Sequence, residues 1–258
     1  MKTMEVIAIK SGKGGCDKTT ATINLAAADA QLFGKNVLVI DTDGRGHTTS
    51  MYAKDCRYQI GDVLLGRVSV FEAIVPTKWD HIDCIGCGEE IKDDLKELEK
   101  KIFMDPMHRL GKILGEIRSI GKYDRCYIDC SQDPDLMAVN IMLHADRILI
   151  PARSDDYSLD GVQKMLEWIS QVSDARTQPI SYSVMITDKE RNKESDDSIA
   201  KIEELVKGCL CRTMVRHQAK IVLHSSKESV KIPFVLEKKL AGVALDYIEL
   251  TKELFHYE

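Results

Sequence analysis

A glycine-rich loop between an apolar strand pattern and a helical pattern is the first feature of the sequence that could do chemistry. It follows the apolar run 6–9 and reads Ser11-Gly12-Lys13-Gly14-Gly15-Cys16-Asp17-Lys18-Thr19-Thr20. Gly12, Lys18 and Thr19 fit the phosphate-loop pattern GxxxxGK[ST], whereas Asp17 stands at the second glycine. Such a loop holds phosphates with backbone N–H groups and a helix N-terminus, while the lysine reaches the β- and γ-phosphates and the hydroxyl ligates Mg²⁺. The loop predicts a nucleotide site.

Two further apolar runs end in carboxylates. Asp41 and Asp43 follow the run 37–40, and Asp129 follows the run 126–128. In open α/β sheets, ligands bind at the carboxyl ends of the strands. Carboxylates placed there, facing the γ-phosphate and Mg²⁺, can orient a water molecule for in-line attack.

These three motifs resemble the ParA/MinD family of P-loop ATPases, whose phosphate loop is the deviant Walker A motif KGGxGKTT. Residues 13–20 resemble that motif and depart from it at Asp17, residues 37–47 resemble VLLIDLDPQGN, and residues 123–130 are similar to the Walker B strand YDYVLIDC. Residues 129–146 keep the spacing of DCPPSLGLLTINALTAAD, with Ser131 and Gln132 in place of its two prolines. The loop TVIPRN is matched only loosely by residues 213–218. The resemblance covers essentially the whole chain.

The resemblance implies a set of residue roles. Lys13 would contact the partner's phosphates in a nucleotide-sandwich homodimer, Asp43 would position water, and Asp129 would hold Mg²⁺ through water with support from Asp41. The catalytic candidates are therefore Lys13, Lys18 and Asp43. The candidates for binding ATP or ADP are Gly12, Lys13, Gly14, Gly15, Cys16, Asp17, Lys18, Thr19, Thr20 and Arg216, and those for Mg²⁺ are Thr19, Asp41 and Asp129.

The alternation of strand and helix patterns predicts one α/β domain over residues 1–258, with a doubly wound, mostly parallel sheet covered by helices on both faces. The strands are expected at residues 6–9, 37–40, 81–85, 126–128, 147–151, 181–186 and 212–215. The helices are expected at residues 19–32, 91–102, 110–120, 159–172, 199–206 and 241–254, and residues 188–197 are expected to form a surface loop that leads into a helix.

Charge is distributed unevenly along the chain. The formal net charge is −5, but residues 201–240 contain nine Lys or Arg and four Glu. A local basic face can bind DNA weakly and without sequence preference, although a solvated helix face would have the same composition. The candidate DNA contacts are Arg212, Arg216, Lys220 and Lys231.

The favoured hypothesis is an ATP-dependent dimerisation switch in plasmid, chromosome or mobile-element partitioning, with nonspecific DNA binding by the dimer. A ParB-like stimulating partner is implied by the resemblance. The loop begins near residue 12, which is typical of the short Soj-like type without an N-terminal helix-turn-helix. No apolar stretch is long enough for a membrane span, and residues 248–258 are acidic rather than a basic membrane-surface helix. We expect a cytoplasmic protein, nucleoid-associated if it binds DNA.

The cysteines suggest a less favoured alternative. Eight cysteines in a chain without an export signal are expected to be reduced, and Cys126 and Cys130 lie in an apolar strand pattern. The pair Cys84-Ile-Gly-Cys87 has the spacing of metal and redox sites but supplies only two ligands. A metal or iron-sulfur carrier ATPase would therefore need a dimer to complete the site.

Asp17 suggests a second alternative, a degenerate scaffold or regulator that binds nucleotide poorly. Its carboxylate would compete with phosphate for the N–H groups of the loop. Two unit charges about 4 Å apart repel by roughly 4 kcal/mol at an effective dielectric of about 20, which is nearly three decades in affinity. Outward rotation of Asp17, its protonation, Mg²⁺, or pairing with Lys13 or Lys18 would reduce that penalty.

Overall fold

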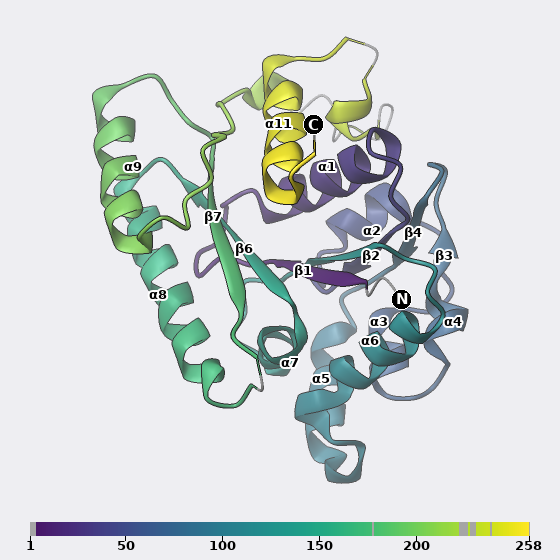
Figure 1. Ribbon diagram of the computed structural model, residues 1–258. Coiled ribbons are helices and arrows are strands. Elements are labelled where there is room, and N and C mark those ends of the chain that lie inside the picture. Colours follow the sequence, from purple (N-terminus) through teal and green to yellow (C-terminus); the bar gives the residue numbers. More distant parts are fainter. Residues whose placement is uncertain (1–3, 177, 222–226, 228–230, 238, 258) are drawn as a thin grey trace.

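The computed structural model describes residues 4–176, 178–221, 227, 231–237 and 239–257, which form a seven-stranded sheet with helices on both faces (Figure 1). The strand order is β3-β4-β2-β5-β1-β6-β7, and each neighbouring pair is parallel except β3 with β4. The predicted doubly wound, mostly parallel α/β fold is confirmed. Among the described residues, no helix combines the length and the apolar character needed to cross a bilayer.

The elements follow the chain in alternation. The strands are β1 (Glu5–Ile9), β2 (Val37–Asp41), β3 (Val75–Pro76), β4 (Ile82–Ile85), β5 (Arg125–Asp129), β6 (Arg147–Arg153) and β7 (Ser181–Thr187). The α-helices are α1 (Lys18–Gln31), α2 (His47–Tyr52), α3 (Ile60–Leu64), α4 (Val70–Ala73), α5 (Ile91–Lys100), α6 (Arg109–Ser119), α7 (Leu136–His144), α8 (Asp156–Ser173), α9 (Lys193–Val206) and α11 (Gly242–Phe255). Short 3₁₀ turns are η1 (Ile102–Met104), η2 (Pro106–His108) and η3 (Phe234–Leu236).

The sheet separates two apolar cores. Along β1, Val6 and Ala8 face one core and Ile7 and Ile9 the other, as the period of two in a strand requires. Helices α3 to α9 cover the first core, and α1, α2, η3 and α11 cover the second. Because both faces are covered, the central strands are apolar at nearly every position.

Helix α1, which begins at the phosphate loop, is fixed to the sheet by a buried ion pair. Asp29 is 0% exposed and accepts hydrogen bonds from Arg125 Nη1 at 2.7 Å, from the Tyr127 hydroxyl at 3.1 Å and from the Tyr257 hydroxyl at 2.7 Å. A buried charge needs such partners. The alanines along α1 allow close packing against the sheet and α11, so the loop at its N-terminus has a rigid support.

The expected strand at residues 212–215 is wrong. The residues on either side of this segment form isolated bridges, Leu210 with Val184 and Arg216 with Lys189, and within it Val215 N donates to the Ile186 carbonyl at 2.9 Å. The carboxylate of Glu253 in α11 accepts hydrogen bonds from the backbone N–H groups of residues 212 and 213, at 2.6 and 2.8 Å. These N–H groups are therefore unavailable for a continuous strand ladder.

The expected loop at residues 188–197 is only partly correct. Helix α9 already begins at Lys193, because the Asn192 side chain accepts a hydrogen bond from Ser195 N at 2.8 Å and caps the helix. The sequence reading also missed β3 and helices α2, α3, α4 and α7. The first four are too short to show a period, and α7 is apolar on most sides.

Candidate functional site

The three sequence motifs meet at the carboxyl ends of three adjacent central strands. The glycine-rich loop follows β1, Asp41 ends β2, and Asp129 ends β5, which lies between them. Asp41 and Asp129 are direct neighbours in the parallel register. The fold therefore brings the predicted phosphate, metal and water-positioning residues to one edge of the sheet, as expected for an open α/β sheet.

The glycine-rich loop packs closely against α8. A Cβ atom on Gly12 would lie 2.4 Å from the carbonyl oxygen of Gly161, so only glycine fits there without movement. Gly15 has φ 76°, a left-handed conformation that favours glycine. Lys18 opens α1 and is 5% exposed, and the Cys16 side chain is also buried. The loop is thus held in one shape by its neighbours.

Lys13 leaves the loop toward the N-terminal end of α8. Its Nζ lies 3.9 Å from Asp155 Oδ1 and 4.9 Å from the centre of the Tyr157 ring. The Lys13 and Asp155 side chains are both 40% exposed, so this contact is weak and screened by solvent. The lysine can move away from the loop at small cost.

The carboxylates of Asp41 and Asp129 are both buried but have different hydrogen-bond partners. Asp41 accepts bonds from Asp43 N at 3.0 Å and from the backbone and hydroxyl of Thr49, each at 2.8 Å. Asp129 accepts one from the Thr48 hydroxyl through Oδ2 at 2.7 Å. Its Oδ1 is buried without a hydrogen-bond partner among the described residues.

Burial raises the pKa of both carboxyl groups. For Asp41 it does so together with repulsion from Asp129, and the pKa reaches about 7. The Asp41 oxygens already accept three hydrogen bonds, which favour its ionised form, so Asp129 is the member of the pair that more readily holds a proton. A divalent cation near Asp129 Oδ1 would replace this proton, and carboxylate and hydroxyl oxygens are the ligands that Mg²⁺ prefers. Thr19, whose hydroxyl lowers the pKa of Asp129, fits the same site.

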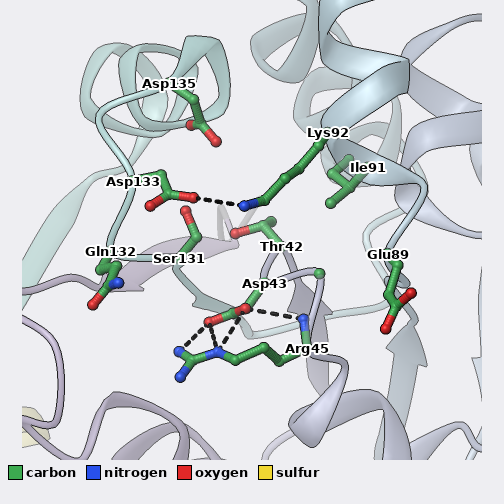
Figure 2. A pocket seen from close by; sticks show the side chains of 11 residues that line it. Thr42, Asp43, Arg45, Glu89, Ile91, Lys92, Ser131, Gln132, Asp133 and Asp135 are labelled. Carbon is green, nitrogen blue, oxygen red and sulfur yellow. Dashed lines mark hydrogen bonds and ion pairs between the residues drawn. The ribbon is translucent and has the colours of Figure 1, made fainter.

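Asp43 lies at the edge of a cavity of about 430 Å³ beside this pair (Figure 2). Its side chain is 12% exposed and forms an ion pair with Arg45. Lys92 of α5 reaches across the cavity to Asp133, with 3.5 Å between Nζ and Oδ2. The cavity lies between the β2 and β5 loops and α5, and its lining residues are Thr42, Asp43, Gly44, Arg45, Glu89, Ile91, Lys92, Ser131, Gln132, Asp133 and Asp135.

Asp17 lines a different cavity, of about 240 Å³, together with Thr20 and Arg216. It adopts φ 55° and ψ 27°, the left-handed conformation that aspartate tolerates better than most residues. Burial raises the pKa of its carboxyl, whereas Arg153 lowers it. Arg153 also forms an ion pair with Asp188. The main cation near Asp17 is therefore Arg153 rather than Lys13, and the predicted phosphate-loop residue faces a polar cluster at the ends of β6 and β7.

Sequence reasoning missed a buried lysine next to the loop. Lys10 is 0% exposed, its Nζ donates to the Ser131 carbonyl at 3.2 Å, and it lies 5.4 Å from the centre of the Trp168 ring. Burial lowers its pKa. The sequence signal was a lysine at the end of an apolar strand. Arg45 and Arg153 were also missed, although both lie at or just beyond strand ends, where site residues gather.

The Cys84 and Cys87 side chains are buried, and burial raises the pKa of both thiols. Metal ligands and nucleophiles are thiolates, which such surroundings disfavour. Cys126 and Cys130 are buried as expected, and all eight cysteines are free thiols. Within the described residues, no group of three or more His, Cys, Asp or Glu side chains has the arrangement of a metal site.

The four predicted DNA contacts do not share one site. Arg212 lines a groove at the β7 edge, Arg216 lines the Asp17 cavity, and Lys231 lines a cavity beside α2 and β3. The Arg216 guanidinium binds Asp246, and Lys231 Nζ donates to Ser50 Oγ at 2.6 Å. Arg212 and Lys220 are exposed. The basic residues are thus spread over the molecule.

Residues 4–182 match a protein-family model described as an AAA domain. The chromosome partitioning protein ParA of Caulobacter vibrioides is 29% identical over 202 residues, which are 77% of this chain and 74% of that protein. The chain belongs to the ParA-like family of P-loop ATPases. The sporulation initiation inhibitor protein Soj of Bacillus subtilis is 26% identical over 255 residues, which are 97% of this chain and 98% of Soj.

The fold of this ParA-like chain is also found in a solved structure of McdA from Cyanothece in complex with ATP. The TM-score is 0.87 at 17% sequence identity, over 100% of this chain and 98% of that one.

Gln132 is one departure of the ParA-like chain from the family pattern, which has proline there. A Cβ on Gly14 would lie 2.2 Å from Gln132 Oε1, so this side chain covers the glycine-rich loop.

Asp129→Asn should stabilise the protein at about pH 8 by roughly 1–3 kcal/mol and have little effect near pH 5. The folded pKa of the Asp41–Asp129 pair is raised, so proton binding stabilises the fold at low pH, and this contribution is lost as the pH rises from about 4 through about 7. Urea unfolding in the absence of Mg²⁺ measures the effect. Equal changes in stability at both pH values would contradict the assignment of the proton to this pair.

Proposed function

We propose that this ParA-like chain is a Mg²⁺-dependent ATPase that uses ATP as a dimerisation switch in DNA partitioning. The observation that carries the proposal is the meeting of the phosphate loop, Asp43 and Asp129 at adjacent strand ends, where one buried Asp129 oxygen has no hydrogen-bond partner in the described part of the chain. Two similarities support it. One relative is named a chromosome partitioning protein, and a structure of the same fold is an ATP complex.

In hydrolysis, the loop residues and Asp43 would have different roles. Backbone N–H groups of residues 13–20 and the Lys18 ammonium would hold the phosphates, because a helix N-terminus and a lysine both favour negative charge. Asp43 would accept a hydrogen bond from a water molecule in line with the γ-phosphate. Attack by this water breaks the bond to the leaving β-phosphate oxygen and yields ADP and phosphate.

Mg²⁺, when bound, would neutralise charge on the β- and γ-phosphates. Asp129 Oδ1 has no hydrogen-bond partner among the described residues and the Thr19 hydroxyl acts on the same carboxylate, whereas the Asp41 oxygens are occupied by Thr49 and the backbone of Asp43. We therefore assign Asp129 the main metal role and Asp41 a supporting one. Asp41 holds the loop after β2 in the shape that presents Asp43.

Lys13→Ala should retain Mg·ATP binding but remain monomeric, whereas Lys18→Ala should lose ATP binding. The exposed Lys13 side chain is available to a partner subunit, and Lys18 is buried inside the loop. Light scattering with ATP and a slowly hydrolysed analogue measures the dimer, and calorimetry measures affinity. A wild-type protein that binds ATP yet stays monomeric would exclude the switch. Loss of ATP binding in the exposed-site control Lys96→Ala would show that the assay is unspecific.

Asp17 favours the second candidate function, a scaffold that binds nucleotide poorly. In the structure, however, this carboxyl lies near Arg153, which supports a loop that still accepts phosphates. The two candidate functions differ in what Arg153 does. In the ATPase, Arg153 offsets the negative charge of Asp17; in the scaffold, the charge already prevents binding.

Arg153→Gln should weaken ATP binding by about tenfold, because Asp17 loses its nearest cation and repels the phosphates more strongly. Asp17→Gly in the same chain should restore the affinity, and Asp17→Gly alone should change it little. Titration with a fluorescent ATP analogue measures all three variants. Arg191→Gln is the matched control, because it changes an exposed arginine in the loop between β7 and α9. A gain of several decades from Asp17→Gly alone would favour the scaffold.

Charge reversal at two exposed residues should test DNA binding. Arg212→Glu with Lys220→Glu is expected to weaken retention of nonspecific DNA by roughly tenfold or more and to reduce its salt dependence, because each lost phosphate contact removes counterion release. Electrophoretic mobility shifts with ATP at several salt concentrations measure this. Lys100→Glu, at the end of α5 on the opposite face of the sheet, is the control. If the wild type, the double variant and the control retain DNA equally, DNA binding through Arg212 and Lys220 is excluded.

A further inference from the structure

Arg45 forms a fork on the carboxylate of Asp43. Its Nε lies 3.1 Å from both Oδ1 and Oδ2, and its Nη2 lies 2.5 Å from Oδ2. The backbone N–H of Arg45 donates to Oδ1 at 3.0 Å. Figure 2 shows the Arg45 guanidinium lying against the Asp43 carboxylate. One residue thus supplies all these donors to Asp43.

These contacts take up most of the acceptor capacity of Asp43. An ionised carboxylate has about four lone-pair positions, and Arg45 directs three N–H groups at them: the backbone N–H, Nη2–H, and Nε–H, which is shared between the two oxygens. A bidentate arginine fork is also among the strongest hydrogen-bonded pairs of side chains. While the fork is closed, the guanidinium competes with any water molecule for the Asp43 oxygens.

The exposure of the Arg45 side chain allows the fork to open. The Arg45 side chain is 58% exposed, whereas Asp43 is 12% exposed, so the guanidinium can turn into solvent while the carboxylate stays in place. Gly44 and Gly46 flank Arg45, and Gly46, with φ 61°, donates its N–H to the Asp43 carbonyl at 2.8 Å, which closes the turn that carries Arg45. Solvent screening keeps the strength of such a pair modest.

We propose that Arg45 is a positioning residue that withholds Asp43 from the attacking water, so that hydrolysis requires the Arg45–Asp43 fork to open. This inference rests on the proposed ATPase function. It adds a control on the rate: Lys18 and the loop bind phosphate, and Arg45 decides when the carboxylate becomes available. The fork lowers basal hydrolysis without reducing nucleotide binding.

Arg45→Gln should raise kcat for ATP hydrolysis by roughly fivefold, as expected from loss of a half-exposed ion pair, with the affinity for Mg·ATP unchanged. Arg45→Lys should give a smaller increase, since an ammonium is a point donor that cannot fork both oxygens. In an Asp43→Asn background, Arg45→Gln should have no effect. Single-turnover hydrolysis and calorimetric binding of Mg·ATP, on the full chain, separate rate from affinity.

Arg57→Gln removes an exposed arginine outside the cavity and should leave the rate unchanged. If the wild type binds ATP but Arg45→Gln leaves kcat equal or lower, the fork does not restrain hydrolysis and the inference is wrong. An increase that persists in the Asp43→Asn background would also overturn it, because the effect would not pass through Asp43. If neither protein binds ATP, the proposed ATPase function itself fails, and the inference falls with it.

Discussion

Two carboxylates buried side by side at the ends of β2 and β5 are the constraint around which this edge of the sheet is organised. Asp41 and Asp129 are adjacent in register, so each raises the cost of ionising the other. Hydrogen-bond donors from the start of α2 offset part of this cost. Thr48 and Thr49 at the start of α2 each reach one carboxylate, which places α2 directly over the strand ends. One oxygen of Asp129 has no hydrogen-bond partner among the residues that the structure describes.

Much of this arrangement could be predicted from the sequence, because the central strands are apolar runs that end in carboxylates or in the glycine-rich loop. The parts that failed depend on long-range contacts. Residues 212–215 have a strand-like pattern, but Glu253, about forty positions later in the chain, takes their N–H groups. The Arg45 fork could not be predicted from residue type, because an arginine two positions after an aspartate more often points into solvent.

The departures from the family pattern are linked to one another in space. Lys10 holds the carbonyl of Ser131, and Gln132 covers Gly14, so both residues that replace the prolines contact the phosphate-loop segment. Asp17 has Arg153 as its nearby cation. Each unusual residue therefore has a polar neighbour.

Both edges of the sheet are blocked against strand addition. Strand β3 is two residues long, runs antiparallel to β4 and contains Pro76, which has no N–H to offer an incoming strand. At the other edge, residues 209–217 bridge to β7 at isolated points and turn further N–H groups toward Glu253. Exposed edges are the usual templates for irreversible stacking of chains. Association of two copies through continuation of the sheet is therefore disfavoured at both edges.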